Sequence, residues 1–133
     1  MSAVEPGVAA MLAGDGPARH YGIVVDAAAD GRAVARIRVT EDMLNGNGGL
    51  HGAVLFTLAD VAFACASNSR GPVTVAASAT IEFLRPAGLG DELVAEAVER
   101  TRAGRSALYD VTVRRGDEVL AEVRGRATEV RAR

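Results

Sequence analysis

The sequence contains no lysine, so all 15 of its basic side chains are arginines. The 17 acidic side chains outnumber them and leave a formal net charge of −2 at pH 7. The arginines are dispersed along the chain, whereas proteins that bind duplex nucleic acid usually carry a basic excess or a basic stripe. The charge balance therefore argues against nucleic acid as a partner.

Long apolar runs and cysteines are also scarce. No stretch approaches the roughly 18 consecutive apolar residues of a membrane span, and the N-terminus lacks the basic start and apolar run of a signal peptide. We therefore expect a cytoplasmic protein that does not act at a membrane. The one cysteine, Cys65, cannot form an internal disulfide, and its Ala and Phe neighbours predict a small buried side chain.

The residues that are present indicate one folded domain over residues 1–133. Hydrophobic residues make up 49% of the chain and charged residues 24%, which is ordinary for a globular protein. Residues 1–19 carry a weak helical pattern and predict a peripheral N-terminal segment, and the Gly- and Asn-rich run at 41–51 predicts a loop. Asp30-Gly31 predicts a hairpin turn. Alternating apolar and polar residues predict strands at 21–25, 33–40, 73–84, 91–102, 106–114 and 119–130.

The segment from Gly52 to Asn68 predicts one substantial helix. Its apolar residues lie around nearly the whole circumference, so the helix is expected to be buried on most sides. Only strands are available to cover it. The simplest architecture is therefore an α+β fold in which a strongly curved antiparallel sheet wraps around one long central helix.

One narrow stripe of this helix departs from the apolar pattern. At about 100° per residue, its small and polar members fall within a quarter of the circumference. They are Ala53, Thr57, Asp60, Ala64, Ser67 and Asn68. Asp60 is the only charged side chain of the helix, and removing a carboxylate from water is costly unless something specific compensates. Two interpretations stay open: Asp60 pairs with an arginine or a loop amide, or it belongs to a functional site.

The start of the helix offers a second chemical group. The first N–H groups of a helix have no internal partner and carry partial positive charge, which suits a developing oxyanion. Because Gly52 has no side chain, it leaves this backbone open to a ligand. The alternative interpretation is that the glycine only eases a tight turn between the loop and the helix. Gly52 and Asp60 are separated by about 12 Å of helix rise, so one chain cannot bring both to one carbonyl. If the two cooperate, a two-fold dimer with shared sites is required.

The run MLNGNGGLHGAVLFTLADVAFACASNS, followed by TIEFLRPAGLGDELVAEA, resembles the PaaI-type hot-dog-fold thioesterases, the phenylacetic acid degradation group. The resemblance covers residues 22–128 and implies the hot-dog fold and hydrolysis of an acyl-CoA thioester. Coenzyme A is then part of the substrate, with no separate cofactor and no metal. The same resemblance makes Asp60 the base or the nucleophile and Gly52 the carbonyl-polarising backbone. It also brings His51 and Asn45 to the site.

The resemblance has consequences for the substrate. Relatives often carry a second glycine where this chain has Ala53, whose methyl group is expected to narrow the acyl or pantetheine channel. Thr57 is a further candidate for substrate contact. Relatives also often prefer aryl-acetyl groups, such as phenylacetyl and hydroxyphenylacetyl, and assemble as dimers of dimers, which implies a homotetramer here. Guanidinium groups suit phosphate, so the candidates for the CoA phosphates are Arg70, Arg85, Arg100, Arg102 and Arg105.

Three other functions fit these residues less well. A hot-dog hydratase or dehydratase uses a histidine with a helix carboxylate in motifs that the Leu-Ala-Asp pattern here does not resemble. A non-catalytic acyl-CoA sensor usually carries a DNA-binding segment, for which residues 1–19 are too short. A purely structural subunit leaves Asp60 without an explanation.

Overall fold

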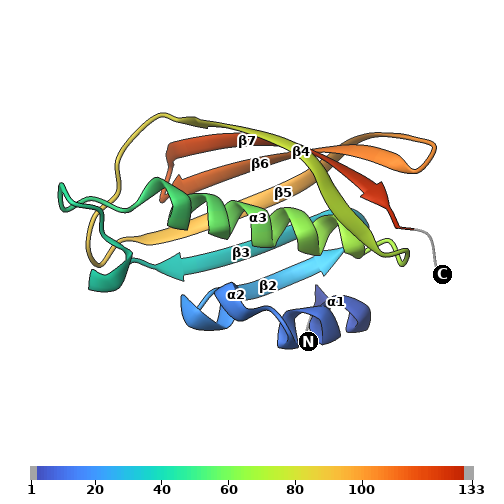
Figure 1. Ribbon diagram of the computed structural model, residues 1–133, viewed down its shortest axis with the longest axis horizontal. Helices are drawn as coiled ribbons and strands as arrows, with labels where there is room; N and C mark the ends of the chain where they lie inside the picture. The colour runs from blue at the N-terminus through green and yellow to red at the C-terminus, as the bar shows by residue number, and fades with distance from the viewer. Residues whose placement is uncertain (1–2, 131–133) are drawn as a thin grey trace.

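The computed structural model describes residues 3–130. One long helix, α3 (Gly52–Asn68), lies along one face of a curved sheet, which has seven strands within those residues (Figure 1). The predicted bounds of the helix and the sheet wrapped around it are both confirmed. The strands are β1 (Ala3–Val4), β2 (Val24–Ala29), β3 (Arg32–Arg38), β4 (Thr74–Phe83), β5 (Glu92–Ala103), β6 (Ser106–Arg115) and β7 (Glu118–Glu129).

The strands lie in the order β1-β2-β3-β5-β6-β7-β4, so the strand that follows the helix is at one edge of the sheet. All neighbours pair antiparallel except β1 and β2, which are parallel. The prediction of a purely antiparallel sheet is therefore wrong at β1, which is two residues long and too short to show an alternating pattern. The predicted Asp30-Gly31 turn is confirmed, with φ of 53° and 79° at its two residues.

Strand β2, which corresponds to the strand predicted at 21–25, begins later than the sequence pattern predicts. Residue 21 does not belong to it, because Tyr21 ends helix α2 (Gly16–His20). Gly22 then takes a φ of 66°, which interrupts extended backbone, and β2 starts only at Val24. The second half of β2 is alanine, a residue depleted in strands, and pairing with β3 holds it there. Tertiary pairing overrides local preference in this element.

The N-terminal segment, for which a peripheral position is predicted, forms two helices and contributes to the core. Helix α1 (Pro6–Ala13) is capped by Glu5, and α2 is capped by Asp15, whose carboxylate accepts the Ala18 N–H at 3.0 Å. Val8 and Ala18 are buried. Figure 1 shows both helices beside β2, below α3. No helix within residues 3–130 has the length and apolar character that crossing a bilayer requires.

The core lies between α3 and the concave face of the sheet. Alanines alternate with larger side chains on β3 and β5, and Ala35 and Ala95 are fully buried where the helix crosses them. Gly125 of β7 leaves room for the ring of Phe63, which would be 2.7 Å from a Cβ at that position. Cys65 is fully buried and its thiol is free, as predicted. Burial, and to a smaller extent the negative charge of Asp15, raises the pKa of this thiol to about 12.

Candidate active site

One stripe of α3 is left open by the sheet, as the helical spacing predicts. Ser67 is an exception, because it is 3% exposed and accepts a hydrogen bond of 2.6 Å from the Thr74 hydroxyl. Asn68 is half-buried and also bonds to Thr74, so both side chains fasten the end of the helix to the start of β4. The stripe residues that stay exposed or half-buried toward the open side are Ala53, Thr57, Asp60 and Ala64.

Asp60 lies in the middle of this stripe and is exposed in the single subunit, so the expectation of a buried carboxylate is wrong for one chain alone. Within residues 3–130 it has neither an arginine nor a loop amide as partner. Partial burial, and to a smaller extent the charge of Asp15, raise the pKa of Asp60 above its ordinary value. The result is a more basic carboxylate that is open to a second molecule.

The start of α3 is capped by the side chain of His51. Its Nδ1 accepts a hydrogen bond of 3.1 Å from the N–H of Ala53. A neutral imidazole that accepts at Nδ1 carries its proton on Nε2, and His51 is exposed on this face. His51 therefore presents an N–H donor to the space in front of the helix.

Gly52 is the first residue of α3, and its own N–H has no acceptor in the described part of the chain. The next donor, on Ala53, is already taken by His51. A Cβ at Gly52 would lie 3.2 Å from two carbons of the Phe83 ring, so glycine keeps the passage beside this ring open. The helix start thus offers a free, dipole-enhanced N–H to an approaching oxygen.

The predicted loop before the helix is present and contains a short 3-10 turn, Glu41–Met43. Asn45 organises the rest of the loop, because its side-chain oxygen accepts the N–H groups of Asn47 at 2.9 Å and Gly49 at 3.2 Å. The His51 N–H donates to the Met43 carbonyl at 2.9 Å, which closes the loop onto the helix start. The backbone N–H of Asn45 donates to the Gly49 carbonyl at 2.7 Å, whereas its side-chain amide N–H groups have no acceptor in the described residues.

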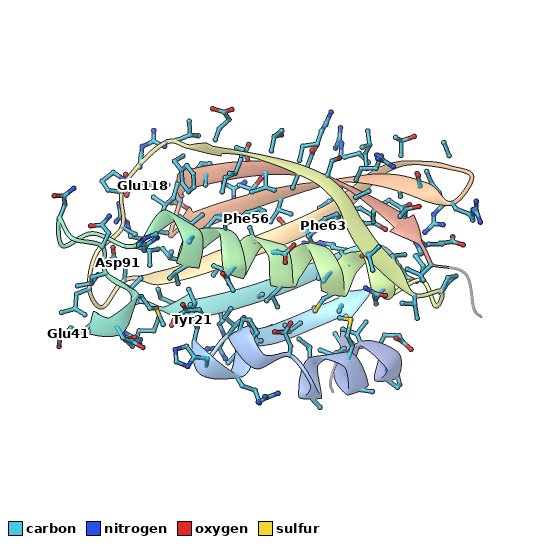
Figure 2. All side chains as sticks on the ribbon, in the orientation of Figure 1. Tyr21, Glu41, Phe56, Phe63, Asp91 and Glu118 are labelled. Atoms are coloured by element: carbon cyan, nitrogen blue, oxygen red, sulfur yellow. The ribbon has the colours of Figure 1, made fainter. Side chains whose placement is uncertain are left out.

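Two hollows flank the start of α3. The larger, of about 380 Å³, is lined by Gly52, Phe83 and Arg85 together with apolar side chains of the same region. The smaller, of about 230 Å³, lies on the other side of the helix start and is lined by His51, Tyr21 and neighbouring residues. Figure 2 shows Tyr21 below the first half of α3, on the side of the N-terminal helices. The helix start therefore has open space on both sides.

The five candidate arginines have different surroundings. Arg85 lines the larger hollow, where its guanidinium donates to the Val119 carbonyl at 2.6 Å. Arg70, which follows the other end of α3, and Arg102 both pair with Glu99. Arg100 pairs with Asp110, and Arg105 lies at the β5–β6 turn. Of the five, only Arg85 is beside Gly52.

The structure brings together Gly52, His51, Asn45 and Arg85 at one end of α3 and places Asp60 two turns further along. Thr57 lies between, with its hydroxyl donating to the Ala53 carbonyl at 2.8 Å. The sequence did not indicate Tyr21 or Phe83 as site residues. Tyr21 is predicted to lie in a strand, and the alternating pattern that ends at Phe83 predicts only which face of β4 the ring is on. No group of three His, Cys, Asp or Glu side chains in the described chain is arranged to hold a metal ion.

Comparison with known proteins shows the family to which this chain belongs. Residues 47–122 match the family model described as the Thioesterase superfamily. The chain is also 40% identical over 122 residues to the acyl-coenzyme A thioesterase PaaI of Escherichia coli (strain K12), covering 91% of this chain and 87% of that protein. The chain belongs to the PaaI type of the thioesterase superfamily.

The solved structures agree with this assignment. The PaaI protein from the phenylacetic acid degradation operon of E. coli superposes with a TM-score of 0.90 at 38% identity, covering 93% of this chain and 91% of that one. A mutant form of the phenylacetic acid degradation protein PaaI of Thermus thermophilus gives 0.84 at 38% identity, covering 87% and 100%. The predicted hot-dog fold and the predicted class of enzyme, an acyl-CoA thioesterase, are confirmed.

Proposed function

We propose that this PaaI-type thioesterase hydrolyses its acyl-CoA ester at sites that combine Gly52 of one subunit with Asp60 of another. The observation that carries the proposal is a pair of open groups on α3, an N–H and a carboxylate that have no partner within residues 3–130 and are separated by about 12 Å of rise. A reacting carbonyl has to be within about 3 Å of both its donor and its attacking group. Two α3 helices related by a two-fold axis would meet this requirement at two equivalent sites.

Strand β4 is the second reason for a dimer. It is the outer strand of the sheet and is exposed along most of its length, including Val75 at 50% and Phe83 at 55%. A long apolar edge strand invites pairing with another chain. Pairing of two β4 strands around the two-fold axis would cover this edge, extend the sheet across both subunits and bring the two open helix stripes to the same side. Two such dimers then form the homotetramer.

The groups have distinct roles in this reaction. Asp60 removes a proton from a water that attacks the thioester carbon, or attacks this carbon itself to give an anhydride that water then hydrolyses. The C–S bond breaks, the acid is released, and the CoA thiolate takes up a proton. Negative charge on the carbonyl oxygen is stabilised by the Gly52 N–H, with Nε2–H of His51 and the Asn45 amide as further donors.

The remaining residues of the site fit a CoA ester. Arg85 meets the CoA phosphates at the larger hollow, and Ala53 and Thr57 line the path of the acyl or pantetheine chain along the stripe. We further propose that the substrate is an aryl-acetyl ester such as phenylacetyl-CoA or hydroxyphenylacetyl-CoA, because the E. coli relative is encoded in a phenylacetic acid degradation operon. The proposed place of the reaction is the cytoplasm. Coenzyme A arrives with the substrate, so no separate cofactor takes part.

The direct test of the catalytic assignment is Asp60→Asn. Turnover of phenylacetyl-CoA, followed through the free thiol, should fall at least about a hundredfold, as expected for a missing base or nucleophile. The variant should remain folded, because the raised pKa of Asp60 shows that folding disfavours its ionised form. An Asp60→Asn protein that hydrolyses the ester at the parent rate would falsify the assignment.

Mixing two inactive variants tests whether the sites are shared. Subunits carrying Asp60→Asn and subunits carrying Gly52→Pro are unfolded together, refolded and assayed. In mixed dimers one site has both intact groups, so random pairing should restore about one quarter of the parent activity. Sites built within a single chain would stay inactive at every mixing ratio.

A further inference from the structure

We propose that the smaller hollow, beneath Tyr21, receives the aryl ring of the acyl group, and that Tyr21 determines the preference for aryl-acetyl over short acyl groups. The inference rests on the proposed function and gives the N-terminal helical segment a part in substrate choice. It is carried by the position of the hollow, the charges in its walls and its size.

The position of the hollow follows from the shape of a thioester. Its carbonyl carbon has two substituents that point to different sides, the acyl group and the CoA arm. The free N–H of Gly52 lies between two hollows, one lined by Gly52 and Arg85 and the other by His51 and Tyr21. An ester whose carbonyl oxygen meets Gly52 can therefore place one substituent in each hollow.

Charge decides which substituent occupies which hollow. Arg85 in the wall of the larger hollow attracts the CoA phosphates. Asp42 in the wall of the Tyr21 hollow repels phosphate, since two negative groups raise each other's free energy at short distance. The acyl group is therefore assigned to the Tyr21 hollow.

The Tyr21 hollow also has the size for one aromatic ring. Met43 and Val54, which are 2% and 6% exposed, lie beneath its floor, and Leu44 and Ala53 line it beside the polar Asp42 and His51. A cavity of about 150 Å³ is sufficient for benzene, so the hollow of about 230 Å³ has room for a phenyl ring with its methylene. The hydroxyl of Tyr21 has no partner in the described residues and can bond a ring hydroxyl.

Tyr21 is held in place before any substrate binds. Its N–H donates to the Pro17 carbonyl at 3.0 Å, and its ring makes an edge contact with His20, with 4.8 Å between ring centroids. A wall that is already ordered loses little conformational entropy on binding. Tyr21 can therefore contribute the exposed part of its ring to recognition of the substrate ring.

The test compares two esters in three variants. Tyr21→Ala should lower kcat/KM for phenylacetyl-CoA at least about tenfold, because an aromatic wall is lost, while acetyl-CoA, which does not reach the hollow, should change less than about twofold. Tyr21→Phe keeps the ring and should keep the parent ratio. Leu89→Ala, which truncates a side chain 63% exposed outside both hollows, is the surface control. Melting temperatures verify the fold of each variant.

A second measurement does not depend on catalysis. Binding of free phenylacetate, read by ligand-observed NMR, should weaken at least about tenfold in Tyr21→Ala and remain at the parent value in Leu89→Ala. If the parent hydrolyses CoA esters but Tyr21→Ala changes neither the ratio of kcat/KM for the two esters nor phenylacetate binding, the assignment of the hollow is overturned and the proposed function stands. If the parent hydrolyses no CoA ester, the proposed function fails, and the phenylacetate measurement still decides what the hollow binds.

Discussion

Replacement of Gly52 by proline tests the oxyanion site, because it removes the one N–H at the helix start that is proposed to bind the oxyanion. Gly52 is the first residue of α3, the position where proline is best tolerated, and its N–H makes no hydrogen bond within the described chain. The preceding residue, His51, has φ −64° and ψ 131°, in the extended region that a residue before proline prefers. The helix should therefore form normally.

The expected cost to catalysis follows from the loss of one oxyanion donor. Such a loss typically lowers kcat by about 10² to 10³, which corresponds to about 2.7–4 kcal/mol of transition-state stabilisation. Proline also adds a Cβ, which at this position lies 3.2 Å from the Phe83 ring. Gly52→Ala is the matched control, because it adds the same Cβ and keeps the N–H, so its kcat should stay within about tenfold of the parent.

The assay follows thiol release from a saturating acyl-CoA ester, with circular dichroism and melting temperature recorded for both variants. Saturation matters because the N–H acts on the transition state, so kcat rather than KM should carry the effect. If Gly52→Pro turns over as fast as Gly52→Ala, the Gly52 N–H does not stabilise the oxyanion. A proline variant that melts far below the alanine variant would instead place the defect in folding, contrary to the helix-start argument.

Three further predictions concern stability and assembly. Gly125→Ala should cost about 1–3 kcal/mol in urea unfolding, because its Cβ would meet the Phe63 ring at 2.7 Å; a loss undiminished in a Phe63→Leu background would contradict this cause. Burial opposes ionisation of Glu99, but hydrogen bonds from Arg70 and Tyr109 and the charges of Arg70 and Arg102 outweigh it and lower its pKa. The ionised Glu99 therefore stabilises the fold at neutral pH, and this stabilisation is lost as the pH falls below about 4. The melting temperature of Glu99→Gln should therefore drop less between pH 7 and pH 3 than that of the parent, and parallel curves would refute the argument. Val75→Asp places a charge on the exposed β4 edge, so it should give a monomer by light scattering that is inactive in the thiol assay. An active monomer would disprove shared sites.

Several elements of the site could be predicted from the order of the residues alone. The bounds of α3, the Asp30-Gly31 turn and the open stripe from Ala53 to Ala64 all follow from local spacing, and each is present. The need for a second subunit also follows from spacing, because helix rise alone separates Gly52 from Asp60. That need stays a prediction until the mixing experiment is done.

Other features depended on contacts between distant segments. The sequence could not indicate that Arg70 and Arg102 converge on Glu99, because strand register and the path of the chain after α3 set these pairs. Nor could it show that Ser67 turns inward to meet Thr74.

The chain by itself determined the helix, its chemistry-bearing stripe and the motif that marks the family, because these depend on residues within a few positions of one another. Only the tertiary structure decided that Asp60 is open rather than buried, that the Gly52 N–H is free while the Ala53 N–H is not, and that Tyr21 meets Met43 and Val54 around one hollow. Those outcomes depend on how the loop, the N-terminal helices and the sheet pack around α3, and side-chain spacing along one segment carries no information about that packing.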